Sequence, residues 1–180
     1  MALLNMVYAP DPRLKKNCDA VTDINNDMRQ LADDMLETMY EKEGVGLAAP
    51  QIGETIRLFV MDCEQIAAEE EDGKSTPGKP YKLFNPVILE ASEETNEREE
   101  GCLSLPGVLQ PVTRPKKVTV EYFDENGNKQ TLKADDLTAT CIQHELDHLN
   151  GTLLTDYMGP VKRQMTLKKL RKWKKDQEHQ

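Results

Sequence analysis

The sequence predicts an α+β protein in which mixed or antiparallel β-sheets pack around one central helix, with a further helix near each end of the chain. Three observations support this class. Residues 28–39 place apolar side chains at helical spacing, and the short apolar runs 56–61 and 83–90 are typical of strands. Residues 141–152, CIQHELDHLNGT, combine an apolar helical stripe with two histidines four residues apart.

The first helix is expected to close at Gly44, because glycine is the commonest residue just beyond a helix end. Its apolar side chains recur at the spacing of one helix face: Met28, Leu31, Ala32, Met35 and Met39. The two strands that follow are joined by residues 63–82, which are acidic and then rich in Gly, Pro and Ser. We expect this segment to be a mobile surface loop.

A β-hairpin is predicted next along the chain. The segments KKVTVEYF (116–123) and KQTLKADDL (129–137) alternate apolar and polar residues around the turn sequence DENGN. The helix with the two histidines follows, and residues 161–175 form a last, strongly basic helix.

The histidine motif has the pattern of a metal site. His144 and His148 lie one turn apart on the same helix face, so both imidazoles can reach one ion. Glu145 would then lie beside the ion, where it could accept a proton from water. The third histidine, His179, belongs to a charged tail. The metal therefore needs a further ligand of another residue type.

Two residues remain open as the third ligand. Asp156 is the only carboxylate between His148 and the tail, and Cys102 lies in EEGCLSLPG, where glycine and proline indicate a sharp turn. Cys141 is too far from His148, because seven residues span about 10 Å of helix. Leu154 stands where the protease motif HExxHxxGxxH has its third histidine, which excludes that class.

Three stretches together resemble the signature motifs of the bacterial peptide deformylases. They are GVGLAAPQIG (44–53), EGCLSLPG (100–107) and QHELDHLNG (143–151), in that family's order and at similar separations. The likeness includes the flanking segments and so covers nearly the whole chain. It implies a metal-dependent hydrolase that removes the N-formyl group from the N-terminal methionine of newly synthesised proteins and releases formate.

The resemblance also assigns the metal site. It implies Cys102, His144 and His148 as ligands of one divalent ion, with the open position that a catalytic site needs. It suggests Fe(II) in the cell, while a set of one cysteine and two histidines also accepts Zn(II), Ni(II) or Co(II).

Further roles follow from the same resemblance. Glu145 becomes the general base and acid, and the Gln51 amide with the backbone N–H of Leu103 stabilises the oxyanion. Gly44 and Gly46 are expected to let the substrate backbone lie close.

The substrate pocket is expected to be apolar, because it receives a methionine side chain. The resemblance places it near Val45, Leu105, Leu137 and Cys141, and it suggests a substrate contact for Arg114, which as a surface residue could equally be solvated.

Composition limits the remaining function classes. The 180 residues are 38% hydrophobic and 31% charged, no apolar run reaches the ~20 residues of a membrane span, and the first ten residues do not resemble a signal peptide. Four cysteines without a regular spacing fit a reducing compartment. We expect one cytoplasmic catalytic domain over residues 1–180, without membrane or DNA as a partner.

Charge is unevenly distributed along the chain. Residues 161–175 carry eight of the 23 basic residues and no acid, which leaves 15 basic against 32 acidic residues elsewhere, a net charge of −17. The segment 161–180 is therefore a basic helix and tail, which is either simply solvated or binds ribosomal RNA where nascent formylated chains emerge.

Two other functions remain open at this point. A metalloprotease would use Asp156 as its third ligand and would not need Cys102. A structural metal module, or an RNA-binding protein without catalysis, would have no use for Glu145 beside an open coordination position.

Overall fold

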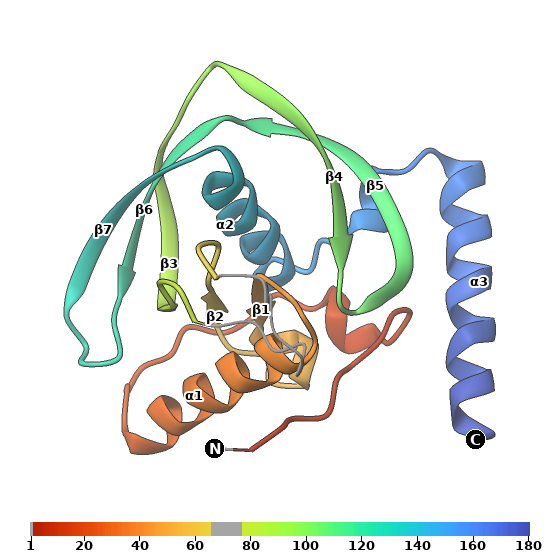
Figure 1. Ribbon diagram of the computed structural model, residues 1–180, viewed down its shortest axis with the longest axis horizontal. Helices are drawn as coiled ribbons and strands as arrows, with labels where there is room; N and C mark the ends of the chain where they lie inside the picture. Colours follow the sequence, from red (N-terminus) through yellow and green to blue (C-terminus); the bar gives the residue numbers. More distant parts are fainter. Residues whose placement is uncertain (1, 66–76) are drawn as a thin grey trace.

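The computed structural model describes residues 2–65 and 77–180, and within them it shows two antiparallel sheets and three α-helices (Figure 1). The α+β class is thereby confirmed. The named pairings of strands are all antiparallel, so the mixed sheet that the sequence left open is not formed among these residues. The middle of the expected loop 63–82 lies outside the described residues.

Helix α1 (Asn26–Glu41) has the apolar face that the sequence predicts, but it ends differently. The residue in the left-handed conformation is Glu43, with φ of 57°, and not the expected Gly44. The N–H groups of Glu43 and Gly44 donate to the carbonyls of Tyr40 and Met39 at 3.0 and 2.9 Å. This double hydrogen bond is a Schellman end, which satisfies two otherwise free carbonyls.

The larger sheet has the strand order β1-β2-β3-β6-β7. Its last two strands form the predicted hairpin, with Val118 opposite Ala134 and Val120 opposite Leu132. The bounds of the five strands are β1 Gly46–Ala48, β2 Leu58–Met61, β3 Tyr81–Ala91, β6 Lys117–Phe123 and β7 Lys129–Asp135.

A second hairpin forms where the sequence indicated only a turn. Strands β4 (Thr95–Cys102) and β5 (Leu105–Pro115) pair from Thr95 opposite Pro115 up to a register shift after Gly101. In Figure 1 this hairpin arches over helix α2. The hairpin thus carries Cys102 to the helix with the two histidines.

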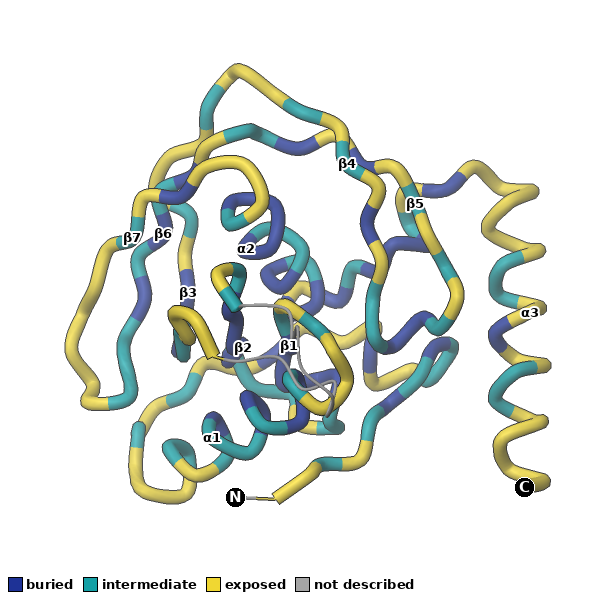
Figure 2. Tube along the Cα trace, in the orientation of Figure 1, coloured by how far each residue is buried: buried dark blue, intermediate teal, exposed yellow. Residues whose placement is uncertain are grey.

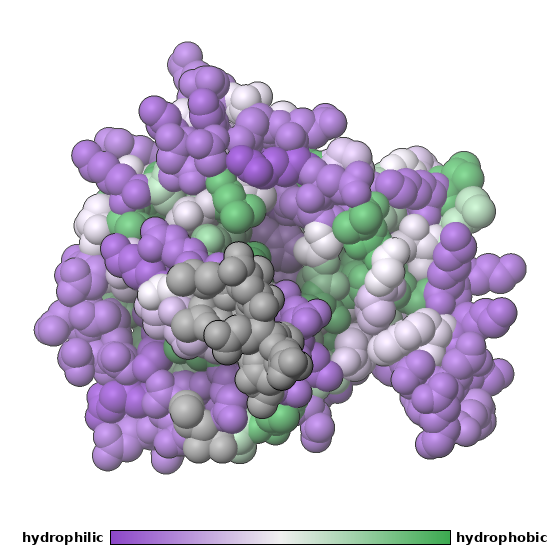
Figure 3. Space-filling model, in the orientation of Figure 1, coloured by the Kyte–Doolittle hydropathy of each residue, from purple (hydrophilic) through white to green (hydrophobic). Residues whose placement is uncertain are grey.

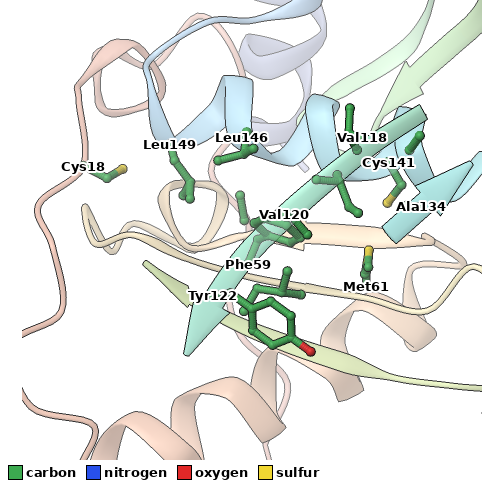
Figure 4. Packing of buried hydrophobic residues seen from close by; sticks show 14 residues of the cluster. Cys18, Phe59, Met61, Val118, Val120, Tyr122, Ala134, Cys141, Leu146 and Leu149 are labelled. Atoms are coloured by element: carbon green, nitrogen blue, oxygen red, sulfur yellow. The ribbon is translucent and has the colours of Figure 1, made fainter. Parts of the chain in front are cut away.

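Helix α2 (Asp136–Leu149) is the centre of the molecule, with the larger sheet packed against it. Figure 4 shows apolar side chains of the helix and of the strands filling the space between them. Phe59, Val120, Ile142 and Leu149 are completely buried in this cluster. Burial of each such side chain contributes about 1.5–3 kcal/mol, so the core fixes the position and rotation of α2.

Helix α3 (Pro160–Glu178) lies at the edge of the molecule and is mostly exposed (Figures 1 and 2). Leu170 is its buried side chain, and the ring of Trp173 packs edge-on against Tyr8 with centroids 4.8 Å apart. Three short 3₁₀ helices complete the fold: η1 Pro12–Lys15, η2 Ala49–Ile52 and η3 Leu154–Tyr157. None of the helices in the described part of the chain is long and apolar enough to span a membrane.

Candidate active site

Three potential metal ligands converge where β4 meets α2. The ligand atoms of Cys102, His144 and His148 all lie within 4.8 Å of one another, and Cys102 Sγ is 3.2 Å from His148 Nε2. Donors about 2.0–2.3 Å from one ion require separations of this order. Burial lowers the pKa of His148 well below its usual value, so its imidazole is neutral, which is the form that binds metals. The donor set therefore fits a divalent ion.

Asp156 does not join this group. It forms ion pairs with Lys15 and Arg163 and accepts a hydrogen bond from the Leu153 N–H at 2.8 Å. Its carboxylate holds η3 between the N-terminal segment and α3. Cys141 also lies outside the group and packs in the apolar core.

A buried carboxylate orients the His144 ring through the nitrogen that is not assigned to the metal. Glu100 Oε1 lies 2.9 Å from His144 Nδ1, which leaves His144 Nε2 for a metal. Arg114 donates to both oxygens of Glu100, at 2.8 and 2.9 Å. Burial raises the pKa of Glu100, but the bonds from His144 and Arg114 outweigh it and hold the pKa below its usual value. Glu100 is thus an anion that fixes the imidazole ring.

Glu145 is the unpaired acid of the site. Its side chain is 3% exposed, and Oε2 is buried without a hydrogen-bond partner among the described residues. Burial raises the pKa of Glu145 to about 7. A carboxyl group with this pKa can both accept and return a proton near neutral pH.

Gly46 makes room for this carboxylate. A Cβ atom at position 46 would lie 2.6 Å from Glu145 Oε1 and 2.9 Å from Cys141 Sγ. Gly44 has a similar reason to be glycine, since a Cβ there would meet Leu103 Cδ1 at 2.7 Å. The two glycines let the chain around the start of β1 run close to the site.

The Gln51 side chain is held in one orientation. It is 1% exposed, its oxygen accepts from the Ala48 N–H at 2.9 Å, and its Nε2 donates to Ser104 Oγ at 3.1 Å. Gln51 Nε2 also lies 3.5 Å from Cys102 Sγ. The amide N–H groups therefore point at the ligand cluster.

These groups open into one cavity of about 780 Å³. It is lined by the residues that the sequence predicted for substrate and oxyanion, namely Gly44, Val45, Gly46, Gln51, Leu103, Leu105, Leu137 and Cys141. His144, Glu145 and Cys102 line it as well. Thr140 places a polar side chain in a wall that is otherwise largely apolar.

Arg114 is not where the sequence suggested. It is 5% exposed and does not line the cavity, because Glu100 and Asp147 hold its guanidinium behind His144. It is thus neither beside the substrate nor solvated.

Sequence reasoning also missed Glu100 and Ser104, which act through other side chains. Only the position of Glu100 two residues before Cys102, on the same strand face, could have indicated it.

Comparisons with known proteins identify the family of this chain. The family model described as polypeptide deformylase matches residues 3–164. A peptide deformylase of Rhodopseudomonas palustris is 48% identical over 172 residues, with 96% of this chain and 95% of the relative covered. One of Wolbachia pipientis is 47% identical over 179 residues, with 99% of each covered.

Solved structures resemble the whole chain. The peptide deformylase of Ehrlichia chaffeensis in complex with actinonin is 41% identical, with a TM-score of 0.86 and coverage of 96% of this chain and 98% of the other. That of Legionella pneumophila is 39% identical, with a TM-score of 0.85 and 99% of each chain covered.

Proposed function

The chain belongs to the polypeptide deformylase family, and we propose that the cavity beside α2 is where it removes the formyl group from N-formyl-methionyl peptides. Hydrolysis of this formamide releases formate and leaves a free amino terminus. One observation carries the assignment: Glu145, whose buried Oε2 has no hydrogen-bond partner among the described residues, lies in the cavity beside the ligand cluster of one cysteine and two histidines.

Cys102, His144 and His148 hold the metal ion in this proposal. When bound, the ion supplies a Lewis acid that polarises the formyl oxygen and lowers the pKa of a water molecule. We propose Fe(II) as the ion in the cell, with Zn(II), Ni(II) or Co(II) as ions that the same donors accept. A thiolate on ferrous iron is open to oxidation, so we expect the iron form to lose activity in air. An iron form with stable activity in air would contradict this choice.

Glu145 moves the proton. Its unpartnered oxygen accepts a proton from the attacking water and then gives it to the leaving amine. The pKa near 7 suits both steps, because neither protonation state is strongly favoured at neutral pH.

Gln51 and Leu103 stabilise the negative charge that develops on the formyl oxygen. The Gln51 amide is fixed before substrate binds, so it needs no reorganisation during the reaction. Leu103 follows Cys102 at the end of β4 and lines the cavity, which supports its backbone N–H as the second donor. A single donor of this kind contributes about 10²–10³ in kcat.

The methionine side chain occupies the apolar part of the cavity. Val45, Leu105, Leu137 and Cys141 form its wall, while Gly44 and Gly46 allow the peptide backbone to approach. A formyl carbon carries only hydrogen, so a tight fit at the ligand cluster would exclude acetylated chains.

We further propose that residues 1–180 form a single cytoplasmic catalytic domain built around the HExxH helix α2. The basic helix and tail 161–180 would bring it to the ribosome, where formylated chains emerge. The exposure of α3 and its eight basic residues between 161 and 175 support this partner.

The direct test of the base is Glu145→Ala, measured as formate release from a formyl-methionyl peptide under anaerobic conditions with iron-loaded protein. We expect hydrolysis to be lost while the variant still binds one metal ion, because Glu145 is not a ligand. Glu93→Ala, which changes an exposed acid away from the cavity, is the matched control and should retain the parent rate. Full activity of Glu145→Ala would overturn the proposed role.

A further inference from the structure

One cation lines the substrate cavity. Among the described residues around it, Arg98 is the only lysine or arginine. It lies on β4, where Asn96, Arg98 and Glu100 point inward and the alternating Glu97 and Glu99 are exposed, Glu99 at the border of the cavity. The side chain of Arg98 is therefore directed toward α2 and the cavity.

In the described part of the chain Arg98 forms only one ion pair, and it is a long one. Its nearest carboxylate oxygen, Asp136 Oδ1, is 3.9 Å from Nη2, and the Asp136 side chain is 54% exposed. Arg98 Nε is buried without a hydrogen bond, while 38% of the side chain is exposed. Arg114, by contrast, has carboxylate oxygens at 2.8 and 2.9 Å. The exposed end of Arg98 is thus available to an anionic group of a ligand.

The position of Arg98 selects one residue of the substrate. His144 and Leu137 lie two turns apart on the face of α2 that lines the cavity, and Asp136 next to Arg98 lies at the start of that helix. In an extended peptide, alternate side chains point the same way, with two residues spanning about 7 Å. If the methionine side chain packs near Cys141, one helix turn from His144, the third side chain points to the same wall about 7 Å farther from the ligand cluster, near Leu137 and Arg98.

We propose that Arg98 is a specificity-determining residue that favours peptides with aspartate or glutamate at the third position. The proposal rests on the function proposed above. A second-position side chain points to the opposite side, so an acid there gains nothing from Arg98. An ion pair at a half-exposed site raises affinity only modestly, and the expected gain in kcat/KM is about two- to fivefold at low ionic strength, falling with added salt.

The test compares peptides that differ only in charge. Formate release is measured for formyl-Met-Ala-Asp-Ala against formyl-Met-Ala-Asn-Ala, and for formyl-Met-Asp-Ala-Ala against formyl-Met-Asn-Ala-Ala. Each pair gives a ratio of kcat/KM values for aspartate over asparagine. The proteins are the parent, Arg98→Gln and Lys133→Gln, which removes one exposed positive charge outside the cavity.

We expect the third-position ratio to be about two to five in the parent and in Lys133→Gln, and to fall to about one or below in Arg98→Gln. The second-position ratio should be the same in all three proteins. A third-position ratio that Arg98→Gln leaves unchanged, or an equal loss on every peptide, would overturn the role of Arg98 alone. A metal-loaded parent that releases formate from none of the four peptides would overturn the proposed function and this inference together.

Discussion

At the scale of single residues, the positions of Glu145 and Gln51 depend on close contacts with their neighbours. Glu145 Oε1 occupies space that any side chain at position 46 would need, and the Gln51 amide is fixed by bonds on both of its ends. The proposed base and the proposed oxyanion donor are therefore oriented by neighbours that take no part in the chemistry.

Gly46→Ala tests this dependence. The new methyl group would lie 2.6 Å from Glu145 Oε1, so the carboxylate must move. Because a displacement of about 1 Å can cost about 10²-fold in rate, we expect kcat for formate release to fall by about that factor. The control is Gly159→Ala, since a Cβ atom there would meet no atom within 4 Å. Equal rates in both variants would contradict the steric account.

At the scale of elements, α2 is held between the larger sheet and the β4–β5 hairpin by different forces. The sheet contributes apolar burial, whereas the hairpin contributes a chain of charged hydrogen bonds from His144 through Glu100 to Arg114 and Asp147. Tyr157 extends this chain from η3, because its hydroxyl donates to Asp147 Oδ2 at 2.6 Å.

Arg114→Met should weaken metal binding without touching a ligand. It leaves the buried Glu100 without its bidentate partner, and loss of one member of a buried pair costs about 3–5 kcal/mol of stability. We expect metal release to a chelator to be about 10–100-fold more favourable, together with a lower Tm. Tyr157→Phe keeps Arg114 in place and should show a much smaller effect. A similar metal affinity for Arg114→Met and the parent would rule out a link between Arg114 and His144.

A second polar anchor joins α1 to the end of β2. The buried Asp62 accepts hydrogen bonds from the Tyr40 hydroxyl at 2.6 Å and from the Lys79 N–H at 3.0 Å. Burial raises the pKa of Asp62, but these bonds outweigh it and hold the pKa below its usual value of 3.8. Since the folded pKa is lowered, the stabilisation is complete above pH 3.8 and is lost as the pH falls through the folded value.

Asp62→Asn should therefore be destabilising at neutral pH and should remove part of the acid dependence of stability. The measurement is the free energy of unfolding in urea between pH 7 and pH 3 for parent and variant. The two curves should converge toward the acid end of the range. A constant difference between them would show that the Asp62 charge does not contribute.

The elements differ in how far the sequence could predict them. The apolar spacing of α1 and α2 and the DENGN turn are local signals, and all three features are present, as is the predicted basic helix α3. Strand β1 has three residues, too few to show a period, and β4 reads TNEREEGC, with charged residues on both faces. The buried charge of Glu100 is tolerated because Arg114, on the neighbouring strand, pairs with it, a contact that no local pattern shows.

The residues of the candidate site also differ in how far the sequence could predict them. His144, Glu145 and His148 are neighbours on one helix and could be predicted from spacing. Cys102 is brought to them by β4, and the sequence physics left it open against Asp156 until the resemblance to a family was considered. The place of Arg114 could not be predicted, because it depends on two carboxylates from separate elements.

At the scale of the whole molecule, the negative body and the basic α3 form a strong charge asymmetry. Most of the α3 surface is hydrophilic in Figure 3, with apolar side chains gathered near its start. Only one of its residues is buried, so most of its lysines are free to meet phosphates. This arrangement is what a docking helix for an RNA surface requires.

Replacing Lys168, Lys169 and Lys172 by glutamine tests the ribosome proposal. These lysines are exposed and form no ion pair within the described residues. We expect weaker co-sedimentation with ribosomes. The slope of the logarithm of the binding constant against the logarithm of the salt concentration should be shallower by about two to three, because three phosphate contacts are removed. Formate release from a short peptide should be unchanged. Co-sedimentation equal to that of the parent would show that α3 is simply solvated.

The measurement that most directly tests the assigned active site is the metal content and anaerobic formate release of Cys102→Ser beside Cys18→Ser. Both variants change a free cysteine, but only Cys102 belongs to the ligand cluster. We expect Cys18→Ser to hold one iron per chain and to deformylate at close to the parent rate, and Cys102→Ser to lose both properties. A Cys102→Ser variant that binds iron and releases formate as the parent does would contradict the ligand set and the mechanism built on it.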